Sequence, residues 1–323
     1  MNDFPGQGTA LVGVLDAFWV SKPYLSAKEF RRFCSPVVPL GRLRHRVFTP
    51  HDDLVAGIEI AHYGAENLNA ARVNWEVVDE QGALLHPSLQ GVLVRDLRCG
   101  ELNPVAELRV PLREVAAPSR MTLRVWIEDS PYENAWDLWM FPPEETAPAD
   151  RRIIHRLDEE AESRLARGET LWLKANPETV KTEIALGFSP IFWNTAWTRS
   201  QPPHTLGILC DPDHPALALF PTESHSNWQW WYLVSKAATL ELPKGIRPIV
   251  QVVPDWFEPQ NLGLIFEVTV DTGKLLVTSI DFEAGGVVGQ QMRRSLTAYL
   301  DGDAFNPDVE MTPGQIRDLF HKE

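Results

Sequence analysis

Hydrophobic and polar residues alternate strictly over the middle of the chain, from about residue 44 to 143. In the stretch LVAGIEIAH one face carries Leu54, Ile58 and Ile60, and the other face carries different residues. The stretches RVNWEVV and MTLRVWI repeat this alternation, and turn residues such as those of DEQG separate them. A period of two predicts half-buried strands, because successive side chains of a strand point to opposite faces. Strands of this kind, spread over about 100 residues, predict an antiparallel β-sandwich of immunoglobulin-like size.

A different pattern follows the Pro- and acid-rich linker PPEETAPAD and extends from residue 150 to 323. Helical patterns in DEEAESRLARG, GQQMRRSLTAYL and MTPGQIRDLF are interspersed with apolar runs. The runs are RRIIHRL, ETLWLKA, HTLGILC, RPIVQVV, LGLIFEVTV and GKLLVTSIDF. Continuous apolar strands among helices favour a largely parallel sheet covered on both faces. We therefore expect a three-layer α/β domain here.

Two helical patterns occupy the first 43 residues. Leu11, Leu15 and Phe18 recur at helical spacing, and SAKEFRRFC has Ser26 as an N-cap with Glu29 at the capping-box position. Two helices with no strand to pack against cannot bury both apolar faces. We expect the apolar faces of this segment to pack against a surface outside the segment.

The composition of the chain limits the kinds of partner and the cellular location that we expect for it. The formal net charge is −14 and no basic stripe offsets it, which excludes nucleic acid as an expected partner. No apolar run approaches the roughly 20 residues that a membrane helix needs. The three scattered cysteines fit neither a disulfide framework nor a zinc cluster, and no signal-peptide pattern is visible. These features favour the cytoplasm.

The longest aromatic patch of the chain is FPTESHSNWQWWYL, at residues 220–233. It gathers aromatic rings and hydrogen-bonding groups: Glu223, His225, Asn227, Trp228, Trp230 and Trp231. The rings could stack on sugars, with the polar residues beside them, or they could pack into a core. Large aromatic side chains are mostly buried, which favours packing and still leaves room for an exposed tryptophan at a cleft.

A second candidate is the stretch FWNTAWTRSQPPH, which contains Trp193, Asn194 and Trp197. It follows an apolar strand end, and ligands of α/β sheets bind beyond the carboxyl ends of strands. This stretch is therefore either a pocket wall or a capping loop.

The stretch LCDPDHP could suggest a nucleophile or a metal site. A nucleophilic cysteine on a strained turn needs flanking glycines, whereas Cys210 has Leu209 and Asp211 as neighbours. The acids of this stretch lack the glycine and terminal glutamate of a calcium loop. We expect a buried Cys210 on a turn before a helix, with no metal and no cofactor.

Several long motifs resemble the C-terminal region of large bacterial proteins of glycoside hydrolase family 2, the β-galactosidase-like group. They are DFPGQGTALVGVLDAFW, GFSPIFWNTAW, LGILCDPDHPAL, FPTESHSNWQWW and RPIVQVVPDW. The resemblance implies three domains: the end of a (β/α)₈ barrel at 1–43, an immunoglobulin-like sandwich at 44–143, and an α/β domain similar to class I glutamine amidotransferases at 150–323.

Such enzymes look like chains whose barrel carries two catalytic glutamates, an acid/base and a nucleophile. No residue of this sequence matches either glutamate, so the resemblance implies an accessory portion without activity of its own. That portion would cover a missing or separate barrel, shape a carbohydrate cleft or support a homo-oligomer. Gly6, Gln7 and Gly8 fall where the loop after the last barrel strand would face the catalytic mouth.

Two alternatives remain open at the level of sequence. The chain could be a stand-alone carbohydrate-binding protein that uses its Trp-rich α/β domain. It could also be an independent hydrolase with its own carboxylate pair, for instance Glu223 with Asp255. Binding without turnover is expected of the first and turnover of the second.

Overall fold

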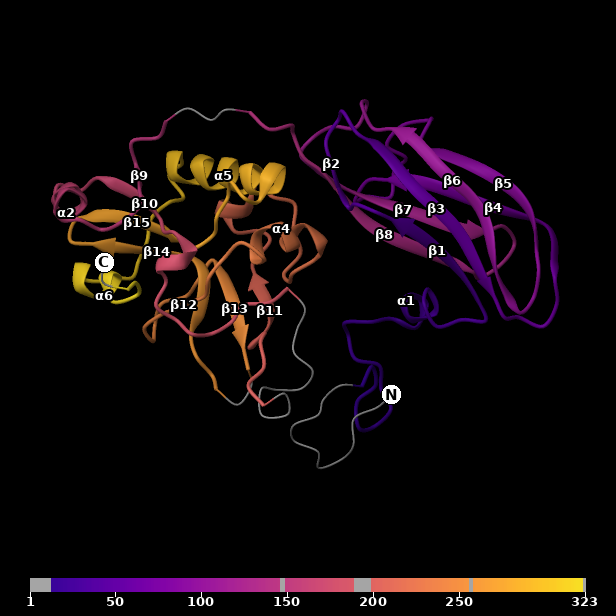
Figure 1. Cartoon of the computed structure of the whole chain (residues 1–323), viewed down its shortest axis with the longest axis horizontal. Helices are drawn as coiled ribbons and strands as arrows, with labels where there is room; N and C mark the ends of the chain where they lie inside the picture. The colour runs from indigo at the N-terminus through magenta and orange to yellow at the C-terminus, as the bar shows by residue number, and fades with distance from the viewer. Residues whose placement is uncertain (1–12, 146–148, 189–198, 256–257, 322–323) are drawn as a thin grey trace. The chain divides into compact units, whose positions relative to one another are not determined.

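Three β-sheets with few helices make up the secondary structure of the chain (Figure 1). The structure is a computed structural model, and it describes residues 13–145, 149–188, 199–255 and 258–321. The chain divides into two compact units, Met1–Phe141 and Pro142–Glu323. Each unit is described by itself.

The first unit is a sandwich of two sheets. One sheet has the order β1-β3-β6, formed by Val37–Leu43, Asp53–His62 and Glu101–Pro111. The other has the order β2-β8-β7-β4-β5, formed by Val47–Phe48, Glu133–Met140, Ser119–Ile127, Leu68–Val78 and Gln90–Leu97. Neighbouring strands pair antiparallel, except that the edge strand β2 runs parallel to β8.

The alternation seen in the sequence determines which side chains fill this sandwich. Leu54, Ile58 and Ile60 of β3 are buried, and they share one hydrophobic core with Val73 of β4 and Val125 of β7. The intervening residues of β3 are only partly buried. The prediction of antiparallel strands with one inward face is confirmed here.

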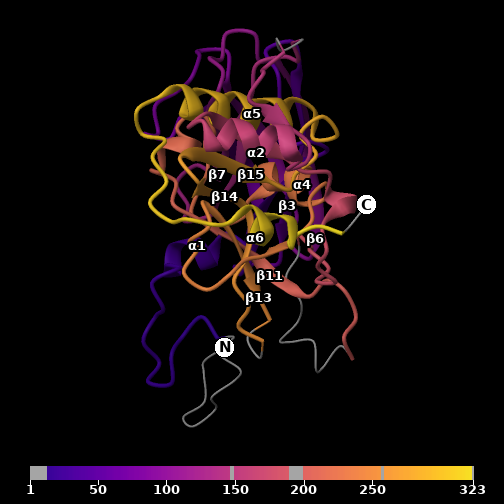
Figure 2. The same ribbon diagram turned by 90° about the vertical axis from the view of Figure 1, so that its left-hand side faces the viewer.

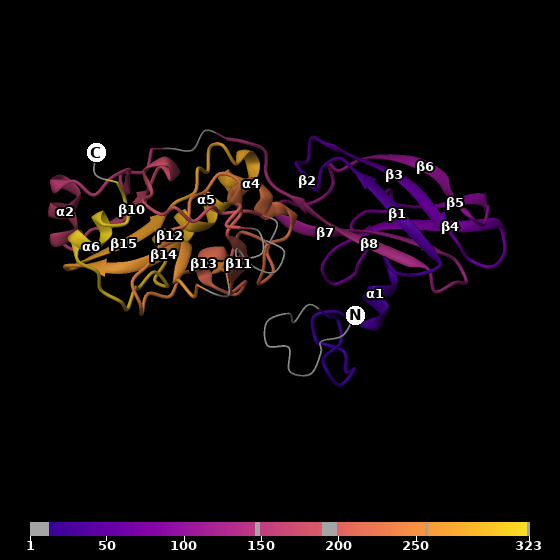
Figure 3. The same ribbon diagram turned by 60° about the horizontal axis from the view of Figure 1, so that its bottom comes forward.

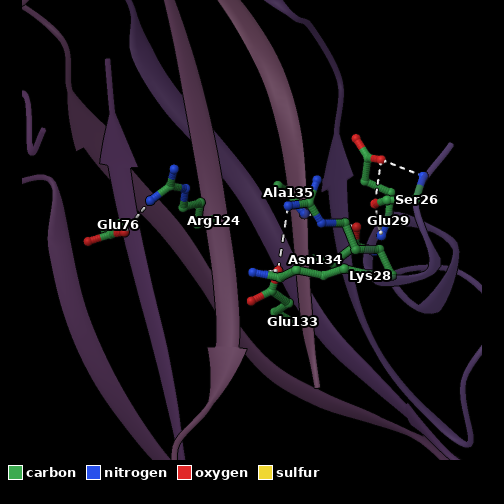
Figure 4. Close-up of polar contacts among 9 residues, drawn as sticks. Ser26, Lys28, Glu29, Glu76, Arg124, Glu133, Asn134 and Ala135 are labelled. Carbon is green, nitrogen blue, oxygen red and sulfur yellow. Dashed lines mark hydrogen bonds and ion pairs between the residues drawn. The ribbon is translucent and has the colours of Figure 1, made fainter. Parts of the chain in front are cut away.

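A short helix, α1 (Ala27–Arg31), precedes the sandwich and is attached to it by charge. Ser26 caps the helix, and Glu29 completes the capping box, as its sequence predicts. Lys28 Nζ lies 3.1 Å from the Glu133 carboxylate on β8, and Arg32 lies 3.5 Å from it (Figure 4). These ion pairs tether α1 to the five-stranded sheet.

The helix predicted around Leu15 and Phe18 is wrong for its described part. Residues 13–20 are not helical, and Leu15 forms an antiparallel bridge with Ser21. The Asp16 carboxylate accepts hydrogen bonds from the backbone N–H groups of Phe18 and Val20. Such local side-chain bonds offer the backbone an alternative to the helix, which explains the departure from the apolar pattern.

Large apolar side chains remain uncovered along this N-terminal segment. The five that are at least 60% exposed are Phe18, Trp19, Val20, Tyr24 and Phe33. Scattered exposed hydrophobic residues are normal on a protein surface, but a run of aromatic ones marks a contact surface.

The second unit is built on one mixed sheet of seven strands. Its main path is β11-β13-β14-β15-β10-β9, and β12 pairs with β14. The strands are Thr205–Cys210, Val250–Pro254, Leu262–Val270, Gly273–Thr278, Thr170–Lys174, Ile153–Ile154 and, for β12, Leu240–Glu241.

The prediction of a largely parallel sheet is wrong. Only β9 and β15 run parallel to β10, and the pairs β11–β13, β12–β14, β13–β14 and β14–β15 are antiparallel. A two-residue turn, Asp271 and Thr272, joins β14 to β15 as a hairpin. Because both faces of the sheet are covered, antiparallel strands here are as continuously apolar as parallel ones, and the apolar pattern does not separate the two cases.

Helices cover both faces of this sheet. The helices α2 (Glu159–Ala166) and α6 (Pro313–Arg317) share a core with inward residues of β10, β14 and β15. The longest helix, α5 (Gly286–Asp301), lies on the opposite face, where Tyr299 donates a hydrogen bond to Glu267 (Figures 1 and 2). The remaining short elements are η1 (Pro177–Thr179), η2 (Pro215–Leu217), η3 (Trp228–Trp230) and α4 (Trp231–Val234). The three layers agree with the α/β expectation in this coarse sense.

Membrane insertion by a helix finds no support in the described residues. None of their helices combines the length and the apolar character that crossing a bilayer requires.

Candidate functional site

The edge strand β11 positions the Trp-rich stretch. Cys210 N donates to the carbonyl of Ser224, and Leu209 forms an antiparallel bridge with His225. The segment before the tryptophans is therefore held alongside β11 as an extra short strand. This pairing fixes where the following helical turn begins.

Asn227 starts that turn. Its side-chain oxygen accepts a hydrogen bond from Trp228 N, and the chain then forms η3, which passes directly into α4. Residues three apart in a 3₁₀ turn lie on the same side, so Trp228 and Trp231 share one side of the turn. Trp230 points elsewhere.

Exposure separates the three tryptophans. Trp228 and Trp231 are 46% and 49% exposed, whereas Trp230 is fully buried. Phe188 contacts both exposed rings, with centroids 5.5 Å from each, and it is tilted by 39° to Trp228 and by 86° to Trp231. We call Phe188, Trp228 and Trp231 the aromatic platform.

Trp230 belongs to the core beneath the platform. Its indole N–H donates to Thr222 Oγ1 at 2.8 Å, and its ring packs edge-on against Phe220. Gln229, also buried, donates to the Pro221 carbonyl. These two hydrogen bonds hold the chain under the platform, so the two exposed rings stand on a buried base, in which Gln229 Oε1 has no hydrogen-bond partner among the described residues.

Polar groups lie in the same stretch of chain. Glu223 accepts a hydrogen bond from the Asn227 side chain at 3.0 Å, and His225 is exposed. Asp255, the proposed partner of Glu223 in a catalytic pair, is only 4% exposed. A carboxyl group this buried is poorly placed to meet a glycoside at a cleft, and the pair remains a prediction.

The other residues predicted for this site fall outside the described ranges. These are Gly6, Gln7, Gly8, Trp193, Asn194 and Trp197. Sequence reasoning missed Phe188, although it lies in the quoted motif GFSPIFWNTAW. Its only signal was an apolar side chain at the start of that motif, because residues 181–188 form no strand and Phe188 reaches the tryptophans of η3 only through the tertiary fold.

Cys210 is not placed as an activated nucleophile. Burial raises the pKa of its thiol to about 11, and the nearby carboxylates of Asp211 and Glu223 act in the same direction. The thiolate is the reactive form of cysteine, so this environment suppresses reactivity. The neighbouring residues form the expected turn: His214 N donates to Asp211 O, and His214 caps η2.

We predict that Cys210 resists alkylation. At pH 8 a thiol with a pKa of about 11 is thiolate to roughly one part in a thousand, whereas the thiols of Cys34 and Cys99 are exposed. Iodoacetamide at pH 8 should modify Cys34 and Cys99 well before Cys210, as followed by mass spectrometry of the peptides. Cys210 is partly buried rather than fully buried as expected, and equal rates at Cys210 and Cys99 would contradict its assignment as inert.

A charged pocket of about 760 Å³ lies along α5 in the second unit. Its arginines are paired with its acids: Arg152 binds both Asp150 and Asp301, and Arg294 lies 3.3 Å from Glu145. Hydrogen bonds from Arg152 hold the pKa of Asp150 below its usual value. These ion pairs link Asp150 and Arg152 to Asp301, and Glu145 to Arg294, along α5.

We predict that the ion pair between Arg152 and Asp150 makes a pH-dependent contribution to the free energy of unfolding. A carboxyl whose pKa is lowered in the folded state adds stability at pH values above its unfolded pKa of about 3.9, and that stability is lost as the pH falls through the folded pKa. Arg152→Gln should therefore reduce the free energy of unfolding at pH 7 by about 1 kcal/mol, a small value because the pair is partly exposed.

The variant should also show a shallower loss of stability below about pH 4, measured by urea unfolding across pH. Arg247→Gln is the matched control, because Arg247 is exposed and has no ion pair among the described residues. Parallel pH profiles for Arg152→Gln and the wild type would contradict the assignment.

Comparison with known proteins gives a family for the second unit. A family model described as "Domain of unknown function (DUF8487)" matches residues 152–321, which is more than half of the chain. The chain belongs to the DUF8487 family. A second model, "Domain of unknown function (DUF8488)", matches residues 52–142, within the region that forms the sandwich. No curated protein matches the chain.

Solved structures that match do so in part and at low identity. Red sea bream transglutaminase is 11% identical with a TM-score of 0.29, and the match covers 43% of this chain and 22% of that one. Parabacteroides merdae β-glucuronidase is 15% identical with a TM-score of 0.23, covering 43% and 21%. A family 123 glycoside hydrolase from Clostridium perfringens is 10% identical with a TM-score of 0.22, covering 38% and 26%. The chain spans less than a third of the length of each of these proteins.

Proposed function

We propose that the chain is a non-catalytic, carbohydrate-binding accessory portion of a β-galactosidase-like glycoside hydrolase, and that the aromatic platform is its sugar contact. One observation carries this proposal. Two large indole side chains, Trp228 and Trp231, are half exposed and each contacts the ring of Phe188, although they follow one another closely in an apolar stretch whose third tryptophan is buried.

A sugar presents two kinds of surface to a protein. A pyranose ring has a face of C–H groups that loses little by leaving water and packs flat on an aromatic ring. Its hydroxyl groups need hydrogen-bonding partners, and His225 is exposed in the adjoining stretch. Glu223 remains a proposed partner, although its Oε2 atom is buried and its Oε1 atom accepts from Asn227. Exposed aromatic groups on a rigid base bind with little loss of conformational freedom.

The accessory role is supported by the first unit. Five large apolar side chains between Phe18 and Phe33 are exposed, and we propose that a (β/α)₈ barrel, as part of the same protein or as a separate chain, covers them. Gly6, Gln7 and Gly8 remain proposed near-substrate residues of that arrangement. Trp193, Asn194 and Trp197 remain proposed neighbours of the sugar.

We also propose family relations for the two units. In the first unit β1, β3 and β6 form one sheet and β4, β7 and β8 lie in the other, which is the order of strands A, B, E and C, F, G of an immunoglobulin-like sandwich. In the second unit, β9, α2 and β10 make a parallel crossover beside β15. We propose that this part corresponds to an amidotransferase-like α/β fold, with the antiparallel strands as additions.

Calorimetric titration with neutral oligosaccharides tests the proposed function. We expect saturable binding of at least one β-linked oligosaccharide in a panel, together with no hydrolysis of chromogenic glycosides by the chain alone. If no oligosaccharide in the panel binds, the platform is not a sugar contact.

The alternative hydrolase is distinguished by turnover. If the chain alone hydrolyses a chromogenic glycoside and Glu223→Gln abolishes the activity, the non-catalytic assignment is wrong. Asp255→Asn is less informative on its own, because replacing a buried side chain can also disturb folding.

A further inference from the structure

The second unit contains a basic pocket that the aromatic platform does not include. It has a volume of about 660 Å³, which is in the range of small-molecule sites. Its ionisable lining residues are His155, Arg156, Lys181, Arg317, Asp318 and His321. Three permanent cations and two imidazoles thus face one carboxylate, in a chain whose net charge is −14.

The sheet topology places this pocket at a position suited to ligands. His155 and Arg156 directly follow β9, and Ala175 directly follows β10, its parallel neighbour. Loops beyond the carboxyl ends of adjacent parallel strands converge on one edge of a sheet, where α/β proteins bind ligands. The helices α2 and α6 lie at the same end of the unit (Figures 1 and 3).

The last residues of the described chain close the pocket. Lys181 N donates to Leu319 O, and His321 N donates to Thr179 O, so residues 179–181 and 319–321 form a short antiparallel ladder. This ladder brings Lys181 and His321, which are 140 positions apart, to the same wall. Buried Leu157 and Leu173, with Phe320, supply an apolar floor.

The donors of the pocket outnumber the acceptors. Arg156 lies 3.6 Å from Asp158, and Arg317 pairs with Glu162. One carboxylate engages at most two of the five N–H groups of the Arg317 guanidinium. Lys181 has no carboxylate within ion-pair distance among the described residues.

His155 adds a further polar group. Its Nδ1 lies 3.1 Å from the Lys174 carbonyl, which can only accept, so Nδ1 carries the proton. In this tautomer the other ring nitrogen, Nε2, is an acceptor, so it can accept a hydrogen bond from a hydroxyl group of a ligand but does not bind its anionic group.

We propose that this pocket binds a small organic anion of sugar size, held through a phosphate or carboxylate group by Lys181, Arg156 and Arg317, with its body against the apolar floor. The ion-paired pocket along α5 does not share this property, because its acids equal its arginines in number. The proposal is independent of sugar binding at the aromatic platform.

The test is calorimetric titration of the full chain with glucose 6-phosphate, glucuronate and neutral glucose. We expect at least one of the two anions to bind and glucose not to bind at this site, with affinity falling as NaCl is raised. Binding of the phosphate alone or the carboxylate alone identifies the group that the pocket selects.

Lys181→Gln should weaken that binding about tenfold, as expected for the loss of one charge-assisted hydrogen bond. Lys181 is exposed, so the variant should fold, and Lys244→Gln, at another exposed lysine of the same unit, should bind like the wild type. Trp228→Ala should leave anion binding unchanged. Failure of both anions to bind, or equal affinity in Lys181→Gln and the wild type, would overturn the proposal.

Discussion

Replacing Gly289 by alanine is expected to destabilise the second unit severely, by about 3 kcal/mol or more. Gly289 lies in the first half of α5, and a Cβ atom at this position would come within 1.9 Å of the Phe282 carbonyl oxygen. That oxygen belongs to the backbone, so the conflict cannot be relieved by a side-chain rotation. Phe282 is itself buried and packs edge-on against Trp172.

The expected loss of stability in Gly289→Ala is opposite in sign to the effect that helix propensity predicts. Helix propensity alone predicts that glycine to alanine inside a helix stabilises by about 1 kcal/mol. The control is Gly302→Ala at the end of α5, where a Cβ atom would meet nothing nearer than 3.6 Å. Urea unfolding monitored by circular dichroism should show a large loss for Gly289→Ala and little change for Gly302→Ala. A stabilised Gly289→Ala would mean that α5 does not approach the residue 282 loop in this way.

Removing both exposed rings of the platform is expected to weaken oligosaccharide binding at least thirtyfold. Aromatic residues at the centre of a binding surface are typical hot spots, each worth about 2 kcal/mol on truncation. Trp228→Ala and Trp231→Ala remove half-exposed side chains, so the free energy of unfolding should change by less than about 1 kcal/mol. Calorimetry with the oligosaccharide identified for the wild type measures the loss.

Two variants serve as comparisons. Trp19→Ala removes an exposed tryptophan of the first unit, 72% exposed, and should leave oligosaccharide affinity unchanged. Trp230→Ala should instead lower the free energy of unfolding by about 3–5 kcal/mol, because it opens a cavity in the core. If the double variant at Trp228 and Trp231 binds as tightly as the wild type, the platform does not carry the binding.

The sequence predicted individual elements well where local chemistry decides them. The alternation of Leu54, Ile58 and Ile60 identified β3, because a strand with one buried face must repeat every two residues. The cap Ser26 marked the start of α1, because its side chain accepts a backbone N–H that a helix start leaves open, and Thr312 caps α6 in the same way.

The sequence failed where the answer depended on distant partners. Strand direction in the second unit is set by connections, and an apolar run such as LGLIFEVTV carries no signal that separates the parallel from the antiparallel case. The predicted helix near Leu15 was overridden by hydrogen bonds to the Asp16 side chain. In both cases the apolar pattern is present in the sequence, but it does not determine the structure that the segment adopts.

The sequence alone was also insufficient to define the aromatic platform and the basic pocket. The sequence indicated the Trp-rich stretch, but only the pairing with β11 and the turn at Asn227 decide that Trp230 is buried and its two neighbours are exposed. The basic pocket had no sequence signal, because Lys181 and His321 meet through a backbone ladder between distant segments. Contacts of this kind are visible only in the folded chain.

The most direct test of the sugar-binding platform is the indole N–H region of a ¹⁵N–¹H correlation spectrum, recorded while an oligosaccharide is added. Signals are assigned by single Trp→Phe variants. We expect the signals of Trp228 and Trp231 to shift and to saturate as the oligosaccharide is added. The signal of Trp230, which is buried and hydrogen-bonded to Thr222, should respond weakly. Saturable binding that moves other indole signals and leaves those of Trp228 and Trp231 unchanged would contradict it.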